Sequence, residues 1–322
     1  MQHAGEASAP SKGLVHQALI YGSEQEFMDV ALPFVEQGVA SGEPTLVAVG
    51  ERNVESLRAA LGDAPPGLTL ASVERWYDTS ARTRERLGRW VAERADRGRV
   101  RVMVEPPWAV GHPAQVRDWA RHESVLNLAF SEYPVTFVCP YDARVMPEDI
   151  LGHARSTHPE IVDTAGVTCS GGYEEPVEFC RRLDSAVDRP AGEPFAELRF
   201  GLADLPEVRR AVGAIATEAG LARLRADELV LAVNEVATNA VVHGGPPATL
   251  RFWHGDDEIV FEVSDGGDGI RDALAGQLAP PTAERGGRGL WLTRLLCDAV
   301  EIRNGMGCTV SLHATVPSFS VG

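Results

Sequence analysis

The sequence contains almost no lysine. Of its 322 residues, 30 are basic, and all of these but Lys12 are arginine. A Walker A phosphate loop needs a lysine that reaches the β- and γ-phosphates, and Schiff-base catalysis needs a lysine amine as nucleophile. Lys12 stands in the turn-like segment APSKG and can serve neither purpose. Both mechanisms are therefore excluded, and any nucleotide site in this chain must bind phosphates without lysine.

Cysteines and long apolar runs are also scarce. The five cysteines form no C-x-x-C pair and are odd in number, which argues against a disulfide framework or a zinc knuckle. No stretch approaches the roughly 20 apolar residues of a membrane span. Residues 1–13 lack the basic start and apolar core of a signal peptide. We therefore expect reduced, mostly buried thiols in a cytoplasmic protein that has no membrane partner.

The chain has fewer basic than acidic residues. The 46 acidic residues outnumber the 30 basic ones, which gives a formal net charge of −16. Affinity for duplex nucleic acid comes largely from neutralising phosphates with Lys and Arg. A direct nucleic-acid partner is therefore not expected.

The first half of the chain alternates short apolar runs with longer segments of helical period. Strand-like runs lie at 15–21, 45–49, 68–73, 100–105 and 135–139, and helical patterns lie at 26–40, 54–61, 81–97, 113–130 and 147–158. This alternation is typical of β-α-β units. It predicts an α/β domain over residues 14–184, built on a doubly wound, mostly parallel sheet.

This half resembles the MEDS sensory module (methanogen/methylotroph, DcmR type), from VHQALIY at 15–21 to CPYD at 139–142. The resemblance implies a sensing role and a small-molecule ligand. The loop GSEQE at 22–26 carries acids where a phosphate loop would stand, so it would repel nucleotide phosphates. Open α/β sheets bind ligands beyond the carboxyl ends of their strands, and a candidate pocket there would be built from Trp108, His112 and Tyr141. Packing is the alternative role for each of these side chains.

The histidines of the first half show no regular ligand spacing. His112, His122, His153 and His158 are scattered over several predicted elements. Zinc sites that are visible in a sequence have ligands at short, fixed intervals. We therefore expect these side chains to pack rather than to bind a metal.

The pattern breaks between residues 164 and 195, apart from one short helical piece at 176–187. The segment DRPAGEP at 188–194 cannot continue a helix or a strand, which predicts a linker at 185–195. Beyond it we expect strands at 196–200, 248–254, 259–264, 299–303 and 309–316, with helices at 205–219, 226–243 and 289–297. This order predicts an α+β domain over 196–317, with helices covering one face of its sheet.

One predicted helix of this second half carries polar groups on an apolar face. The run NEVATNAVVH at 234–243 puts Glu235, Asn239 and His243 at positions i, i+4 and i+8, so the three stack along one side. A carboxylate and an amide on such a helix are costly to bury without a purpose. This stripe is therefore a candidate site.

Two glycine-rich segments follow. DGGDGI at 265–270 ends a predicted strand, and GGRGL at 286–290 opens a predicted helix. Glycines let backbone N–H groups approach phosphates, and a helix N-terminus favours anions. Taken singly, the first segment could be a hairpin or a calcium turn and the second a helix cap. Their order and spacing after the polar stripe favour a nucleotide site instead.

Together the three motifs resemble the N-box, D-x-G-x-G box and G-x-G-L box of the histidine-kinase-like (GHKL) ATPase superfamily. The resemblance covers about residues 195–317 and implies a Bergerat-type α/β sandwich with ATP and Mg²⁺ as cofactors. It implies that Glu235 is the catalytic base or water-positioning carboxylate, that Asn239 is the Mg²⁺ ligand and that Asp265 accepts the adenine amino hydrogen. The other cofactor-binding residues it implies are Gly267, Gly269, Gly287, Gly289 and Thr309.

Two arginines lie beside the last glycine motif. Arg285 and Arg288 flank it in the sequence, and their guanidinium groups could supply the charge that lysine does not. The short segment 271–285 is suited to a mobile lid. We therefore add both arginines to the candidate phosphate site.

Within the superfamily, LPEVR at 205–209, NEVATNAVVHG at 234–244 and GGRGLWL at 286–292 look like the anti-sigma-factor serine kinase branch. That resemblance implies an ATP-dependent serine/threonine kinase of an anti-anti-sigma (STAS) partner, which also holds a sigma factor and works as a homodimer. Two alternatives stay open. One is a non-catalytic, nucleotide-responsive sigma-binding module. The other is a sensor histidine kinase, which is disfavoured because no helical hairpin with a phosphoacceptor histidine precedes the ATPase motifs.

Overall fold

The computed structural model describes residues 13–108, 112–187, 190, 192–280 and 287–317. Lys12 and Arg285 lie outside the described residues. The chain forms two compact units. The first comprises residues 13–77, 83–107 and 123–174, and the second comprises the described residues within 78–82, 108–122 and 175–317. No helix of the described residues is long and apolar enough to cross a membrane.

The first unit contains a seven-stranded sheet in the order β3-β2-β4-β5-β1-β6-β7. All neighbouring strands pair in parallel except β6 and β7, which are antiparallel. The mostly parallel sheet predicted from the sequence is therefore confirmed. Its strands are β1 (Val15–Tyr21), β2 (Thr45–Val49), β3 (Leu68–Ser72), β4 (Val100–Val104), β5 (Val135–Asp142), β6 (Glu160–Asp163) and β7 (Gly166–Cys169).

The helices of the first half follow the expected alternation with the strands. Ser23 caps the first of them, because its hydroxyl accepts the N–H of Glu26 at 3.2 Å. The apolar side chains Phe27, Val35 and Leu57 pack with strand residues in a fully buried core. The helices are α1 (Glu24–Ala40), α2 (Glu51–Leu61), α3 (Val73–Trp76), α4 (Ser80–Ala95), α5 (Pro113–Ala129) and α6 (Glu148–Thr157).

The β6–β7 hairpin was not expected from the sequence. The carboxylate of Asp163 accepts the N–H groups of Ala165 at 2.7 Å and Gly166 at 3.1 Å, which closes the turn. Both strands have only four residues, and β7 is exposed along its whole length. Such strands show no apolar alternation, so the prediction of an irregular chain from residue 164 was wrong here.

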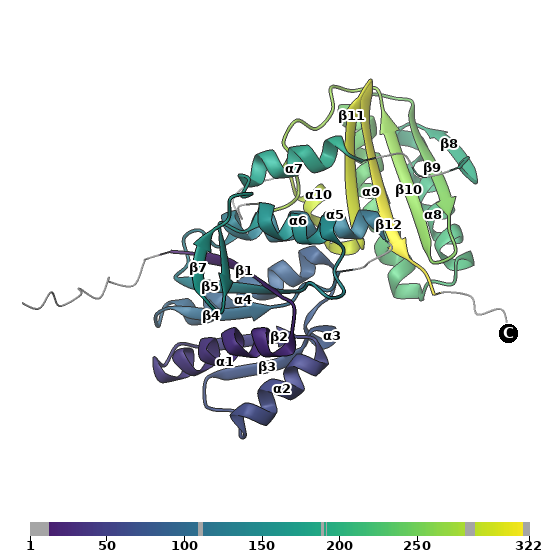
Figure 1. Ribbon diagram of the computed structural model, residues 1–322. Helices are drawn as coiled ribbons and strands as arrows, with labels where there is room; N and C mark the ends of the chain where they lie inside the picture. The colour runs from purple at the N-terminus through teal and green to yellow at the C-terminus, as the bar shows by residue number, and fades with distance from the viewer. Residues whose placement is uncertain (1–12, 109–111, 188–189, 191, 281–286, 318–322) are drawn as a thin grey trace, which may run out of the picture. The chain divides into compact units, whose positions relative to one another are not determined.

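The second unit contains an antiparallel five-stranded sheet in the order β11-β12-β10-β9-β8. Helices α8 and α9 lie along one face of it (Figure 1). The predicted α+β layer, with helices on one face of the sheet, is therefore confirmed. The elements are α7 (Pro176–Ser185), β8 (Ala196–Phe200), α8 (Leu205–Glu218), α9 (Arg223–His243), β9 (Ala248–His254), β10 (Glu258–Asp265), α10 (Arg288–Leu296), β11 (Ala299–Gly305) and β12 (Gly307–Thr315).

Helix α9 is held between the sheet and its neighbouring helices by an apolar core. Leu229, Val233 and Ala237 on α9 are fully buried, as are Leu250 and Phe261 on the sheet. Burying a Leu or Phe side chain contributes roughly 1.5–3 kcal/mol. This packing fixes the rotation of α9 and so determines where its polar stripe points.

Candidate nucleotide-binding site

A cavity of about 880 Å³ opens in the second unit, between α9, the end of β10 and the start of α10. Its size is in the range of small-molecule sites. The structure brings eight of the ten sequence-predicted site residues to its wall. They are Glu235, Asn239, Asp265, Gly267, Gly269, Gly287, Arg288 and Gly289.

The polar stripe of α9 forms one wall of the cavity. Glu235 and Asn239 are half-buried there, and His243, one further turn along, is exposed at the same wall. The stripe faces the cavity because the apolar residues of α9 are buried in the core. A carboxylate and an amide oxygen one helical turn apart are thereby presented to a ligand.

Asp265, the last residue of β10, lies close to the end of α9. Its Oδ1 accepts the N–H of Gly267 at 2.8 Å. A Cβ at Gly244 would overlap the Asp265 side chain, and a Cβ at Gly267 would lie 2.7 Å from the Cα of Gly244. Only glycines allow this close approach of the two segments, so the motif is required by packing as well as by any ligand.

Asn304, at the end of β11, holds the glycine segment in place. Its Oδ1 accepts the N–H of Ile270 at 2.9 Å, and its Nδ2 donates to the carbonyl of Ile270 at 2.8 Å. Gly269, just before Ile270, has φ +79°. Sequence reasoning missed Asn304, because an asparagine beside a glycine at a strand end looks like ordinary turn chemistry.

The start of α10 lies against the polar stripe. Gly287 caps the helix in the left-handed region, with φ +72°. A Cβ at Gly289 would lie 3.1 Å from Glu235 Oε2 and 3.2 Å from Asn239 Nδ2. The first N–H groups of α10 thus lie beside a carboxylate and an amide, which is where a helix terminus can bind an anion.

The remaining predictions have different outcomes. Thr309 is not among the described residues that line the cavity, whereas its neighbours Cys308 and Val310 line it. Successive side chains of a strand point to opposite faces of the sheet, so Thr309 points to the other face. Burial and the nearby charge of Asp265 raise the pKa of the Cys308 thiol to about 11. Of the expected lid at 271–285, the described part contributes Asp272, Ala275 and Gly276 to the cavity wall. Arg285 lies outside the described residues.

The residues at this cavity fit ATP and Mg²⁺. Asn239 supplies an amide oxygen, a donor of the kind that Mg²⁺ prefers, and the Glu235 carboxylate one helical turn away is free of this task and can act as a base. A side chain at position 289 would crowd Glu235 and Asn239. The glycine there therefore leaves room for phosphates beside the N-terminus of α10. Asp265 supplies a carboxylate acceptor next to the buried apolar side chain of Val263, as an adenine ring with an amino group requires.

Comparison with known proteins agrees with this geometry. The family model of the histidine kinase-like ATPase domain matches residues 198–313, and the model of the methanogen/methylotroph, DcmR sensory (MEDS) domain matches residues 15–159. The serine-protein kinase RsbW of Bacillus subtilis (strain 168) is 30% identical over 118 residues, which cover 33% of this chain and 74% of that protein. The serine-protein kinase RsbW of Bacillus licheniformis is 32% identical over 119 residues, with the same coverage.

A solved structure of the catalytic domain of histidine kinase ThkA matches 38% of this chain and 97% of its own, at 14% identity and a TM-score of 0.26. The sequence matches locate the three motifs in an ATPase domain of the kinase type. The chain therefore belongs to the family of histidine kinase-like ATPases that includes the serine-protein kinase RsbW, and it carries a MEDS domain ahead of the ATPase domain.

Proposed function

We propose that this protein is an ATP- and Mg²⁺-dependent serine/threonine kinase and anti-sigma factor. In this proposal its substrate is an anti-anti-sigma protein of STAS type, and its MEDS domain controls its activity. It would regulate transcription in the cytoplasm by holding a sigma factor. The observation that carries the proposal is the meeting of Glu235, Asn239 and the start of α10 at one cavity, in a chain whose relatives are named serine-protein kinases.

The chain's own groups have distinct roles in this proposal. Asn239 holds the metal, while Asp265 and the N-terminus of α10 bind the two ends of the nucleotide. Bound Mg–ATP supplies the phosphoryl group. Glu235 accepts the proton of the attacking serine hydroxyl, as a general base within reach of the phosphate side of the cavity. Arg288 at the same wall adds positive charge in a chain without a phosphate-binding lysine.

The binding part of the proposal is tested with Asn239→Ala. Removing the amide oxygen takes away a metal ligand, so we expect the affinity for Mg–ATP to fall by at least about 10-fold, or about 1.4 kcal/mol. Isothermal titration of the full chain measures this. The matched control is Asn234→Ala on the same helix, because Asn234 accepts a hydrogen bond from Arg209 at 2.9 Å and is not among the cavity's described lining residues. Equal affinity in both variants would contradict the site.

The catalytic part is tested with partners captured from the native cell, with and without ATP. We expect a STAS-type protein and a sigma factor among them, and acid-stable labelling of the STAS protein by γ-labelled ATP. Glu235→Gln should keep ATP binding and lower the labelling rate by about 100-fold or more, since general bases contribute 10²–10⁴-fold. Full labelling by this variant would show that Glu235 is not the base.

Two other outcomes would replace the proposal. Capture of a sigma factor with no labelled partner would identify a nucleotide-responsive binding module. Acid-labile label on the isolated chain would identify a histidine kinase. We extend the proposal to a homodimer, which light scattering tests. We also include a domain division at the predicted linker 185–195, which limited proteolysis tests, and a small-molecule ligand of the MEDS domain, which ligand-induced thermal shifts test.

A further inference from the structure

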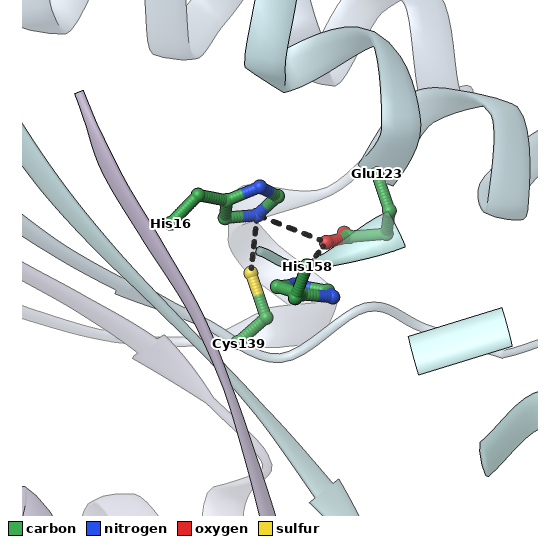
Figure 2. A group of neighbouring side chains, drawn as sticks. All are labelled: His16, Glu123, Cys139 and His158. Atoms are coloured by element: carbon green, nitrogen blue, oxygen red, sulfur yellow. Dashed lines mark hydrogen bonds and ion pairs between the residues drawn. The ribbon is translucent and has the colours of Figure 1, made fainter. Parts of the chain in front are cut away.

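Four side chains with metal-binding chemistry meet inside the first unit. They are His16, Glu123, Cys139 and His158. Each of these residues is at most 2% exposed. Their nitrogen, oxygen and sulfur atoms all lie within 4.8 Å of one another. Figure 2 shows the four side chains pointing toward a common centre. We call them the HECH cluster.

The fold builds the cluster from four separate elements. His16 is on β1 and Cys139 is on the adjacent strand β5, where His16 pairs with Phe137. Since residues two apart on a strand point to the same face, Cys139 shares the face of Phe137 and therefore that of His16. Glu123 is on α5, and His158 follows the last residue of α6. The central strands of the sheet and two helices thus fix the four donors.

Three of the six separations between the donor atoms are of the size that tetrahedral coordination requires, and all six are at most 4.8 Å. The Glu123 carboxylate oxygen Oε2 lies 3.6 Å from His16 Nε2 and 3.2 Å from His158 Nε2. Cys139 Sγ lies 3.6 Å from His16 Nε2. A tetrahedral zinc ion with bonds of about 2.0–2.3 Å places its ligand atoms about 3.3–3.6 Å apart. These three separations agree with that range to within about 0.1 Å.

The outward hydrogen bonds of both imidazoles orient their Nε2 atoms toward the centre. His158 Nδ1 lies 2.8 Å from the carbonyl oxygen of Ala154, which can only accept, so Nδ1 carries the proton. His16 Nδ1 lies 3.0 Å from Asn127 Oδ1. The amide nitrogen of Asn127 donates to two backbone carbonyls, which fixes Oδ1 as the acceptor toward His16. Metal-binding histidines make this type of outer hydrogen bond almost always.

The inward side of the cluster lacks a positive charge of its own. With Nδ1 protonated on both rings, each neutral imidazole turns an Nε2 lone pair toward the Glu123 carboxylate. Within the described chain, His158 Nε2 makes no hydrogen bond, although its side chain is fully buried. Buried polar groups are almost always hydrogen-bonded or bound to a metal. The Cys139 thiol, with its Sγ 3.6 Å from His16 Nε2, can donate one proton within the cluster, and a metal ion would give the remaining lone pair of His158 Nε2 a partner.

We propose that the HECH cluster is a binding site for a divalent transition metal of the zinc type, with His16, Glu123, Cys139 and His158 as its four ligands. Two imidazoles and a thiolate select Zn²⁺ or Co²⁺ over Mg²⁺ and Ca²⁺, which prefer oxygen. Binding releases the thiol proton of Cys139, and the ion compensates the buried carboxylate. Four protein ligands close the coordination sphere, as in structural zinc sites. The rival interpretation is a metal-free network in which one imidazole holds a second proton.

The test uses the full chain, stripped of metal and free of ATP, with Zn²⁺ and Co²⁺ as probes. We expect one equivalent of Zn²⁺ per chain by elemental analysis. With Co²⁺ we expect the strong visible bands of tetrahedral coordination together with a thiolate-to-metal charge-transfer band. Absence of Zn²⁺ uptake, or a Co²⁺ spectrum of octahedral type without the thiolate band, would overturn the proposal in favour of the metal-free network.

Variants assign the metal to this cluster. Cys139→Ser and His158→Gln should each weaken Zn²⁺ binding more than about 100-fold, beyond the effect of losing an outer hydrogen bond. Cys169→Ser is the matched control, because Cys169 is an exposed free thiol of the same unit. Equal Zn²⁺ binding in Cys139→Ser and Cys169→Ser would refute the site. If Cys139→Ser does not fold, X-ray absorption on zinc-loaded wild type decides: one sulfur with two imidazoles supports the site, and any other sulfur number overturns it.

Discussion

Replacing Gly289 with alanine should separate nucleotide binding from stability. The added Cβ would lie 3.1 Å from Glu235 Oε2 and 3.2 Å from Asn239 Nδ2. Favourable carbon contacts begin at about 3.5 Å, so both side chains must move by several tenths of an ångström. Such a displacement of aligned groups is expected to cost about 10-fold or more in Mg–ATP affinity and further in phosphoryl transfer. A 10-fold loss corresponds to about 1.4 kcal/mol.

Stability should change in the opposite direction. Gly289 is the second residue of α10 and does not have a positive φ, so alanine fits its backbone conformation. Alanine is better than glycine in a helix by at most about 1 kcal/mol. Thermal unfolding without nucleotide should therefore show an unchanged or slightly higher midpoint, while titration calorimetry shows weaker Mg–ATP binding.

The control for this substitution is Gly213→Ala on α8. A Cβ there would meet only Val230 Cγ2, at an ordinary 3.5 Å. It should give the same small change in helix stability and leave Mg–ATP affinity unchanged. Unaltered affinity in Gly289→Ala, or a marked loss of its stability in the absence of nucleotide, would refute the argument that this glycine is needed for room at the phosphate side.

Three further predictions follow from single residues. Burial alone would lower the pKa of His313, but hydrogen bonds to Glu258 and Glu301 raise this pKa to about 9. The protonated imidazole therefore contributes its full stabilisation of the fold below about pH 6.5, and this stabilisation is lost as the pH rises through 9. Between pH 6.5 and 9.5 urea unfolding should show wild type losing up to about 3 kcal/mol more than His313→Gln, and parallel pH profiles would exclude this linkage. Asn304→Ala should weaken Mg–ATP binding while Asn234→Ala does not, because Asn304 makes two hydrogen bonds that hold the glycine segment; calorimetry decides. Asn127→Ala should weaken Zn²⁺ binding by about 10–100-fold, which is less than the loss expected for a ligand variant such as His158→Gln. Competition with a chromogenic chelator measures both affinities, and equal losses in the two variants would contradict the outer role of Asn127.

The meeting of the three motifs at one cavity could be predicted from the sequence because the candidate nucleotide site is built from local motifs. Glu235 and Asn239 are four residues apart on one helix, and a helix of known period places them on one face without any tertiary information. Asp265 ends β10 and Gly289 lies in the first turn of α10, where turn and cap chemistry is visible in the sequence. Thr309 shows the limit of this reasoning: a shift of one residue along a strand reverses the side to which a side chain points, and no motif fixed that register.

The HECH cluster could not be predicted in the same way. Its residues are separated by up to 142 positions, and none of the spacings between neighbours in sequence resembles a metal motif. They meet because β1 pairs with β5 in a particular register and because Glu123 in α5 and His158 just after α6 are brought to the same strands. The expectation that His158 only packs rested on the absence of short spacings. That criterion detects ligands on a single loop or helix and is insensitive to ligands supplied by a sheet.

The two sites would select different cations by the chemistry of their donors. The cavity on α9 offers a metal ion the half-buried amide oxygen of Asn239 and is open to a nucleotide, whose phosphates supply further oxygen donors. Such hard oxygen donors suit Mg²⁺, which retains waters and shares phosphate ligands. The fully buried cluster offers imidazole and thiolate donors, for which Mg²⁺ has little affinity. Mg–ATP exchange during turnover would therefore leave a zinc ion in the cluster undisturbed, and the two proposals can fail independently of one another.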